Sequence, residues 1–140
     1  MLQIINGPNL NLLGTREPEI YGSETFENYL SHLRTLIPEE EICYFQSNSE
    51  GALVDCIQQA GMNPSCRGIV LNPAAYTHYS IAIADAISAV KTPVVEVHIS
   101  NIHSRESFRH ETVTGARAKA VLTGFGLKGY ELAIRFLLSC

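Results

Sequence analysis

The sequence lacks the features that mark membrane-spanning, secreted and nucleic-acid-binding proteins. No apolar run reaches the length of about 20 residues that a transmembrane helix needs. Met1 is followed almost at once by a short apolar segment, so we expect no signal peptide. The chain carries 10 Lys and Arg against 14 Asp and Glu, a net charge of −4, which argues against nucleic acid or an anionic membrane as its main partner.

Cysteine is scarce and shows no metal-binding pattern. The four cysteines, Cys43, Cys56, Cys66 and Cys140, form no CxxC, and no histidine is paired with Cys or a carboxylate in a zinc pattern. We therefore expect reduced, mostly packed thiols in a cytoplasmic protein without a metal site. The NGPNLNLLG segment matches neither the GxGxxG nor the Walker pattern, and GFGLKG is better explained by tight strand-to-helix packing, so a nucleotide cofactor is not expected.

The sequence does contain a regular alternation of strand and helix patterns. Strands are expected at residues 2–5, 41–46, 68–71, 94–98 and 120–123. Helices are expected between them: one capped by Ser23 and ending at Pro38, one that follows a turn at 47–50 and stops at Gly61, one at 80–90 and one at 130–138. Residues 112–118 are ambiguous, and a short helical turn is one interpretation.

This alternation predicts the fold class. With 140 residues, of which 46% are hydrophobic, the chain suits one domain, residues 1–140, with one real core. Strands that alternate with helices form a parallel sheet covered by helices on both faces. We predict an α/β, flavodoxin-like, doubly wound sheet of five strands in the order 2-1-3-4-5, with a ligand crevice between the first and third strands.

The helix expected at residues 80–90 is apolar on nearly all sides. Its segment IAIADAISAV contains a single charge, Asp85, which on its own is explained by local capping or pairing. The sheet covers one side of such a helix, and a second subunit is the natural cover for another.

Three polar loops follow the first, third and fourth expected strands, at residues 6–22, 71–78 and 98–110. The first is unusually long for a compact domain, which is typical of a lid or binding loop. Parallel strands present such loops at one edge of the sheet. If the three strands are neighbours, the loops bring together Asn9, Arg16, Tyr21, Asn72, His78, His98, Ser100, Arg105 and Arg109.

These side chains suit proton chemistry on a small polyhydroxylated anion. Arg109 and backbone N–H groups after the fourth strand are candidates to hold a carboxylate or hydroxyls. Tyr21 is the candidate base, because Arg16 in the same loop would favour its phenolate form. His98 is the candidate acid, since imidazole titrates near neutral pH.

Each residue also has a plain structural explanation. For Asn9, capping of its loop explains the residue about as well as a catalytic role does. Tyr21 is explained, more simply, as a packed aromatic that closes its loop. His98 is explained, more simply, as a buried, hydrogen-bonded histidine. Arg105 and Arg109 lie near acidic residues in the sequence, where they would form a solvated charged face. Only their common position at one predicted edge favours the functional interpretation.

Six segments, occurring in the family order, resemble the type II 3-dehydroquinate dehydratases of the shikimate pathway. They are NGPNLNLLGTREPEIYG, QSNSEGALVD, GIVLNPAAYTH, DAI, PVVEVHISNIHSRESFRH and GFGLKGY, and together they span nearly the whole chain. The resemblance implies a flavodoxin-like fold, no cofactor, and a homododecamer built from four trimers. It also implies that 3-dehydroquinate is dehydrated to 3-dehydroshikimate through an enolate.

The resemblance implies roles for individual residues. Tyr21 resembles the base that removes a C2 proton, Arg16 the lid arginine that helps to ionise it, and Asn9 the residue that stabilises the enolate through a water. His98 resembles the acid that protonates the departing C1 hydroxyl, with Glu96 orienting it. The implied substrate-binding residues are Ile99 and Ser100 at the carboxylate, Asn72, His78 and Arg109 at ring hydroxyls, and Asp85, which resembles a residue reaching a neighbouring subunit's site.

Two positions depart from the family pattern. Tyr79 stands where a small Thr is expected, and Glu111 stands where the family often has a second His; residues 112–119 also follow the pattern poorly. Neither position is a predicted catalytic one, but Tyr79 is a candidate to alter helix or subunit packing. Two rival functions remain: a non-catalytic flavodoxin-like module that binds a small sugar acid, and a flavin or nucleotide protein.

Overall fold

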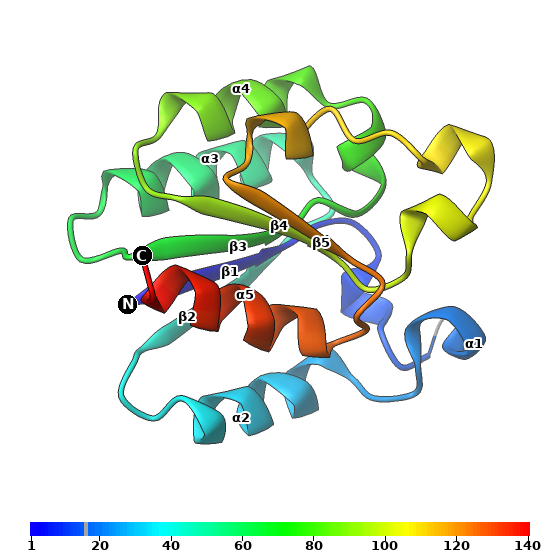
Figure 1. Cartoon of the computed structure of the whole chain (residues 1–140), viewed down its shortest axis with the longest axis horizontal. Coiled ribbons are helices and arrows are strands. Elements are labelled where there is room, and N and C mark those ends of the chain that lie inside the picture. Colours follow the sequence, from blue (N-terminus) through cyan, green and yellow to red (C-terminus); the bar gives the residue numbers. More distant parts are fainter. Residues whose placement is uncertain (16) are drawn as a thin grey trace.

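The chain folds around one parallel sheet. The computed structural model describes residues 1–15 and 17–140, with the backbone but not the side chain of Tyr21. Five strands pair in the order β2-β1-β3-β4-β5, all parallel (Figure 1). They are β1 (Leu2–Asn6), β2 (Ile42–Gln46), β3 (Gly68–Asn72), β4 (Val94–His98) and β5 (Ala120–Thr123). The predicted flavodoxin-like order is confirmed, and β3 lies between β1 and β4.

Two pairs of helices cover the two faces of the sheet, as predicted. One face carries α2 (Phe26–Leu36) and α5 (Lys128–Leu138), and the other carries α3 (Glu50–Met62) and α4 (Ile81–Ala89) (Figure 1). None of the described helices is both long and apolar enough to cross a membrane.

The strands divide their side chains between two apolar clusters, one under each helix pair. Ile4 belongs to the cluster under α2 and α5, and Ile5 to the cluster under α3 and α4. In β3, Val70 faces the first cluster while Ile69 and Leu71 face the second. Successive strand residues point to opposite faces, so a strand that is buried on both sides is apolar throughout.

Short helices lie in the loops. The long loop after β1 contains η1 (Leu10–Leu12) and α1 (Pro18–Tyr21). Further 3-10 turns are η2 (Ala74–His78), η3 (Ile102–Ser104), η4 (Ser107–Arg109) and η5 (Gly115–Arg117). The ambiguous residues 112–118 therefore do contain a short helical turn, η5.

Hydroxyl caps fix the starts of three helices. Ser49 and Ser80 each accept a hydrogen bond from a backbone N–H three residues ahead, which begins α3 and α4. The prediction that Ser23 caps α2 was wrong. Thr25 is the cap, and its Oγ1 accepts from the N–H of Asn28 at 3.3 Å. Both hydroxyls precede the same apolar pattern, so the pattern alone does not choose between them.

Two helix ends also differ from the prediction. α3 does not stop at Gly61 but continues to Met62. A Cβ on Gly61 would collide with the side chain of Val90, so the glycine serves a close approach of α3 to the end of α4 rather than a helix stop. α5 begins at Lys128 rather than at Tyr130, and the helix therefore includes Gly129.

All four cysteines are free thiols. Cys66 is buried, Cys43 and Cys56 are half-buried, and Cys140 is exposed. Burial raises the pKa of Cys56 to about 11, so this thiol stays protonated and unreactive at neutral pH. The predicted packing of most of these thiols is confirmed.

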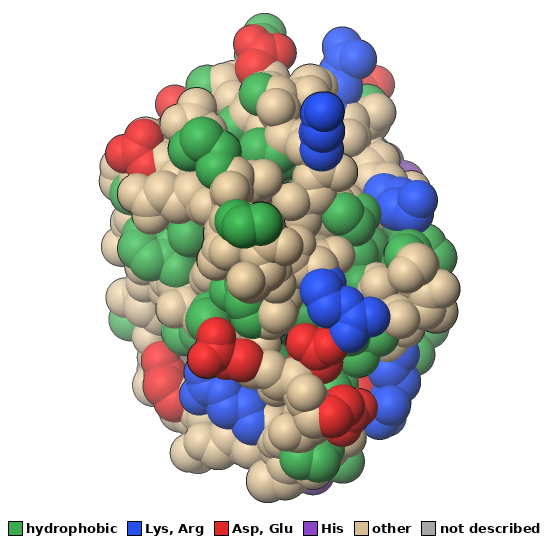
Figure 2. Space-filling model, turned by 90° about the vertical axis from the view of Figure 1, so that its left-hand side faces the viewer, with side chains coloured by type: hydrophobic (Ala, Val, Ile, Leu, Met, Phe, Trp, Pro, Cys, Tyr) green, Lys and Arg blue, Asp and Glu red, His purple; other side chains and the backbone are tan. Residues whose placement is uncertain are grey.

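The two termini lie together at the amino end of the strands (Figure 1). On this side, Figure 2 shows Lys and Arg side chains interspersed with Asp and Glu. Glu40 accepts a hydrogen bond from Arg67 and lies 3.6 Å from the N-terminal amine. Charges of opposite sign thus neutralise each other here, and the face does not present a field of one sign.

Candidate active site

A cavity of about 140 Å³ opens at the carboxyl edge of β1, β3 and β4. Its volume is close to the roughly 150 Å³ of an engineered cavity that holds benzene, so it suits one six-membered ring. Leu10, Leu12 and Leu13 form an apolar wall. The predicted convergence of the three loops is confirmed for the residues Asn9, Asn72, His78, His98, Ser100, Arg105 and Arg109, all of which line the cavity. Ile99, which the resemblance adds, lines it too.

The first loop is held against the second at Gly7. Its N–H donates to the carbonyl of Asn72 at 2.8 Å, and a Cβ on Gly7 would lie 2.6 Å from the carbonyl oxygen of Pro73. Asn9 then adopts a left-handed conformation with φ of 70°, which Asn tolerates better than most residues. Its N–H donates to Oδ1 of Asn48 at 3.0 Å, so the turn before α3 fixes Asn9 at the cavity.

Asn72 ends β3 and is held on both sides of its amide. Its Nδ2 donates to the hydroxyl of Tyr130 at 2.9 Å, and that hydroxyl donates to Oδ1 of Asn6 at 2.8 Å. Its Oδ1 accepts from the N–H of Ala74 at 3.1 Å. Tyr130 is fully buried, and burial raises its pKa far above that of an ordinary phenol, so it remains a neutral donor. Asn72 keeps a second N–H and a second lone pair for a ligand.

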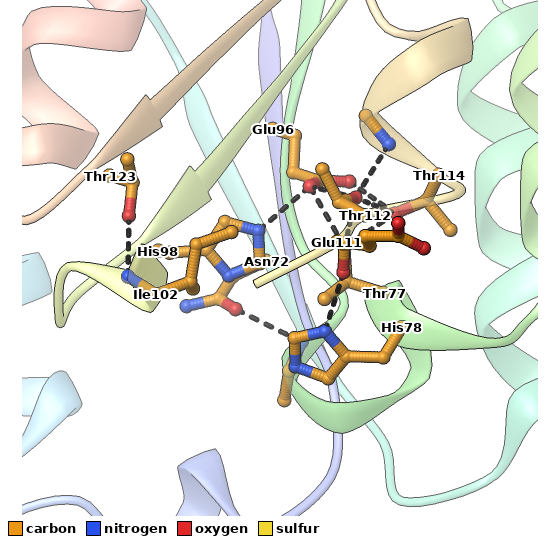
Figure 3. A network of polar contacts seen from close by, with 12 residues as sticks. Asn72, Thr77, His78, Glu96, His98, Ile102, Glu111, Thr112, Thr114 and Thr123 are labelled. Carbon is orange, nitrogen blue, oxygen red and sulfur yellow. Dashed lines mark hydrogen bonds and ion pairs between the residues drawn. The ribbon is translucent and has the colours of Figure 1, made fainter. Parts of the chain in front are cut away.

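His78 is oriented by a backbone group. Its Nδ1 lies 2.7 Å from the carbonyl oxygen of Glu111 (Figure 3). A carbonyl only accepts, so Nδ1 carries a proton and Nε2 is left for a ligand. The departure from the family pattern at Glu111 does not disturb this contact, because only the backbone takes part in it. Tyr79, the other departure, is 63% exposed and stacks edge-on against Tyr76 outside the cavity wall.

His98 and Glu96 form a buried pair at the end of β4. Residues two apart on a strand share a face, so the two side chains lie together. Nε2 of His98 is 2.7 Å from Oε2 of Glu96, which leaves Nδ1 of His98 for a ligand (Figure 3). Glu96 has no exposed surface and His98 is 7% exposed, so Glu96 lies behind His98 and does not itself line the cavity.

Glu96 is ionised despite its burial. Burial alone would raise the pKa of its carboxyl, but hydrogen bonds from His98, Thr114 and Thr112 outweigh burial and hold the pKa below its usual value. The pair therefore places a negative charge directly behind the imidazole of His98.

The loop after β4 is tied to β5 and to the turn that follows it. Oγ1 of Thr123 donates to the carbonyl of Ser100 at 3.0 Å and accepts from the N–H of Ile102 at 3.1 Å. The N–H of Gly126 donates to the carbonyl of Ile99 at 3.0 Å. Ile99 and Ser100, which the resemblance places at a carboxylate, thus lie on a fixed backbone at the cavity.

The two arginines give the cavity a positive character. Arg105 and Arg109 line it, and none of the described residues in its wall is Asp, Glu or Lys. Nε of Arg109 lies 2.8 Å from Oε2 of Glu106, which is exposed at the rim. The interpretation of these residues as a charged surface is therefore right for the Arg109–Glu106 pair, although such rim pairs are weak.

Besides Glu96, which lies behind His98, three predicted site residues are not seen at this cavity. Arg16 lies outside the described residues, and so does the side chain of Tyr21, whose backbone ends α1. Asp85 is exposed on α4 and does not line the cavity of its own chain. Asp85 is therefore not part of this chain's own site, and its predicted role in a neighbouring subunit's site stays a prediction.

Sequence reasoning missed five residues that support the site: Asn48, Thr77, Thr112, Thr114 and Tyr130. Thr112 and Thr114 are two residues apart, so both lie on one face of an extended segment. This spacing was the one signal in the sequence that could have indicated a shared role. Nothing local distinguishes the other three. Among the described residues, no three His, Cys, Asp or Glu side chains are grouped as they would be in a metal site.

The cavity thus combines an apolar wall, two arginines, two oriented imidazoles and an amide. The family model for Dehydroquinase class II matches residues 1–138. The chain is 54% identical over 140 residues to a 3-dehydroquinate dehydratase of Cereibacter sphaeroides, an alignment that covers 99% of this chain and 94% of that protein. It is 51% identical over 137 residues to the catabolic 3-dehydroquinase of Sclerotinia sclerotiorum, covering 95% of this chain and 88% of that one.

The structural comparison agrees with the sequence comparison. The fold matches the crystal structure of the type II dehydroquinase from Propionibacterium acnes with a TM-score of 0.93 and 43% identity, over 99% of this chain and 96% of the other. The resemblance seen in the sequence motifs is therefore confirmed, and the chain belongs to the Dehydroquinase class II family.

Proposed function

We propose that this chain is a 3-dehydroquinate dehydratase, which removes water from 3-dehydroquinate to give 3-dehydroshikimate. The observation that carries the proposal is the His98–Glu96 pair at the cavity, because dehydration needs a proton donor for the departing hydroxyl. A cavity sized for one six-membered ring and lined by two arginines supports a carboxylated cyclic substrate. Relatives that carry the name of this activity support it further.

His98 is the proposed acid. Its Nε2 is engaged with Glu96, so Nδ1 is the nitrogen that gives a proton to the C1 hydroxyl of the substrate. The hydroxyl leaves as water, and the electron pair of the former C2–H bond forms the new double bond. C2 loses a proton, and C1 loses its hydroxyl, which leaves as water with the proton from His98. The reaction therefore balances without an oxidant or a cofactor.

Tyr21 is the proposed base, and it removes the C2 proton to form an enolate. Arg16 lowers the cost of forming the Tyr21 phenolate. Asn9 stabilises the enolate through a water, and its fixed backbone at the cavity supports this role. The alternative, a Schiff base, needs a lysine, and none of the described residues that line the cavity is one.

The remaining groups are proposed to bind the substrate. Ile99 and Ser100 hold its carboxylate. Asn72, His78 and Arg109 bind its ring hydroxyls, and the first two are already oriented by contacts within the protein.

The proposed assembly is a cytoplasmic homododecamer of four trimers, in which each chain is a single domain spanning residues 1–140. Ile83 and Ile87 of α4 are buried against α3 and the sheet, while Ile81 is 69% exposed next to Tyr79. A neighbouring subunit is the proposed cover for this apolar surface, and it would bring Asp85 to that subunit's site.

The function is tested with purified protein and 3-dehydroquinate, by following the absorbance of the conjugated enone product. We expect turnover, a loss of about 10²–10⁴-fold in His98→Asn, and no loss in the control His103→Asn, whose imidazole is exposed and outside the cavity wall. Binding of 3-dehydroquinate without enone formation would contradict the proposal and favour a binding module.

A further inference from the structure

The carboxylate of Glu96 is surrounded by three threonine hydroxyls. Oγ1 of Thr77 lies 2.9 Å and Oγ1 of Thr112 lies 2.8 Å from Oε2, and Thr114 donates to Oε1 (Figure 3). The fourth partner is His98, at Oε2. Thr77 and Thr114 have no exposed surface, and Thr112 is half-buried.

The three hydroxyls also lie within hydrogen-bonding distance of one another, and each has a single hydrogen. Thr112, Thr114 and His98 therefore donate to Glu96 when Thr77 donates to a neighbouring hydroxyl. A carboxylate offers about four acceptor sites, and it has no hydrogen of its own. A protonated carboxyl would place its own hydrogen against one of these donors, which would then have to turn its hydrogen away. The arrangement is therefore complementary to the charged form of Glu96.

Two segments far apart in the sequence are joined to build this cluster. The N–H of Val113 donates to the carbonyl of Thr77 at 2.8 Å, which docks the segment 111–115 on η2. The N–H of Gly115 donates to Oγ1 of Thr112 at 2.9 Å and aims that hydroxyl. The segment that follows the family pattern poorly is thus the one that closes the cluster.

We propose that Thr77, Thr112 and Thr114 are positioning residues that keep Glu96 ionised and thereby keep His98 in its imidazolium form. For turnover, this inference rests on the proposed dehydratase function. The three hydroxyls do not touch the substrate; they act through Glu96.

Glu96 and His98 share the proton that lies between Oε2 and Nε2, so the loss of a threonine hydroxyl changes which of the two residues holds it. With fewer donors, the proton on Nε2 of His98 moves to Oε2 of Glu96, and a neutral imidazole faces a neutral carboxyl. Neutral imidazole is a far weaker acid than imidazolium, so proton donation to a leaving hydroxyl slows. A hydrogen bond to a charged group shifts this balance by about 10- to 100-fold.

The test is the protonation of His98 in the free protein, measured by ¹⁵N NMR at neutral pH. We expect both ring nitrogens to carry a proton in the unmodified protein. Thr112→Val and Thr114→Val, which keep the shape and remove the hydroxyl, should each move the ring toward the neutral form with a single protonated nitrogen. Thr112→Ser and Thr114→Ser, which restore a hydroxyl, should restore the signal.

The matched control is Thr92→Val. Thr92 is half-buried and donates to the carbonyl of Gly61 at 3.3 Å, at the amino end of β4 and far from Glu96. It should leave His98 unchanged. If the valine variants at Thr112 and Thr114 keep a doubly protonated ring, the proposal is overturned.

Kinetics separate this proposal from the proposed function. We expect kcat of each valine variant to fall about tenfold with KM unchanged, since the lost hydroxyls do not touch substrate. The NMR result stands without substrate. If the valine variants change the His98 signal but the protein does not turn over 3-dehydroquinate, the dehydratase function is refuted and the positioning role of the threonines stands. If the protein turns over 3-dehydroquinate but the variants leave the His98 signal unchanged, the positioning role is refuted and the dehydratase function stands.

A second measurement covers the case in which the valine variants do not fold. In the unmodified protein, the hydroxyl protons of Thr77 and Thr114 should be protected from exchange with solvent, and the hydroxyl proton of Thr114 should couple to the Glu96 carboxylate. Hydroxyl protons that exchange as freely as those of exposed threonines would overturn the proposal.

Discussion

Replacing Glu96 by Gln removes the charge behind His98 while keeping the size of the side chain. Glu96 has no exposed surface and lies within hydrogen-bonding distance of His98 and three threonine hydroxyls, so solvent cannot compensate for the change. The variant therefore isolates what the buried carboxylate contributes to the imidazole at the cavity.

The expected losses follow from the contacts that change. A hydrogen bond to a charged group contributes about 1.5–3 kcal/mol and a neutral one about 0.5–1.5 kcal/mol. If the difference of about 1–1.5 kcal/mol appears in the transition state, kcat falls about 5- to 13-fold. The Gln amide also turns an NH₂ group toward hydrogen-bond donors, which leaves at least one buried donor unpaired and lowers the free energy of unfolding by about 1–3 kcal/mol.

The assay is steady-state formation of the enone product by Glu96→Gln, with urea unfolding on the same preparation. KM should stay nearly constant, because Glu96 does not line the cavity. Glu41→Gln, an exposed change at the amino end of the sheet, should match the unmodified protein in both measurements. Unchanged kcat in Glu96→Gln, or a loss confined to KM, would refute the reasoning.

Three further predictions concern pH, the core and the base. Because the pKa of Glu96 is lowered in the fold, its ionisation stabilises the protein above the ordinary carboxyl value of 4.5, and this contribution disappears as pH falls through the folded pKa; acid unfolding should therefore be steeper in the unmodified protein than in Glu96→Gln. Tyr130→Phe breaks the link between Asn72 and β1 and should lower the free energy of unfolding by about 1–3 kcal/mol in urea titrations; a neutral effect would contradict the hydrogen-bond assignment. Tyr21→Phe and Arg16→Ala should each reduce kcat by about 10²–10⁴-fold, and the double variant should be little worse than either, because both disable one proton transfer. Losses that multiply would give Arg16 an independent role.

The sheet order and the position of the site were predictable from the sequence because both depend on local patterns. Each strand is an apolar run between polar loops, and parallel strands place the loops that follow them at one edge. Asn72 and His98 end such runs, Asn9 lies in the loop three residues after β1, and all three line the cavity. Family motifs added the assignment of Glu96 behind His98, which a strand pattern alone does not supply.

The groups that hold the site in place were not predictable, because they are joined by contacts between distant parts of the chain. Asn72 bonds to Tyr130, 58 residues away, and Thr77 contacts Thr114, 37 residues away. A threonine that faces a buried carboxylate has the same local sequence as one that faces solvent. The helix start at Thr25 rather than Ser23 is a smaller case, in which two caps compete within three residues.

Asp85 marks a different limit. Its side chain is exposed on α4 and lies away from the cavity of its own chain, so neither the sequence nor a single chain defines what it contacts. Its proposed role depends on a neighbouring subunit.

The most direct test of the account is the crystal structure of Tyr21→Phe with 3-dehydroquinate, since removal of the proposed base preserves the bound substrate. We predict that the ring fills the cavity, with the C1 hydroxyl oxygen within about 3.2 Å of Nδ1 of His98 and the carboxylate at Ile99 and Ser100. A ring bound in this cavity with its C1 hydroxyl turned away from His98, or a ring bound elsewhere on the chain, would contradict the assignment of His98 as the acid.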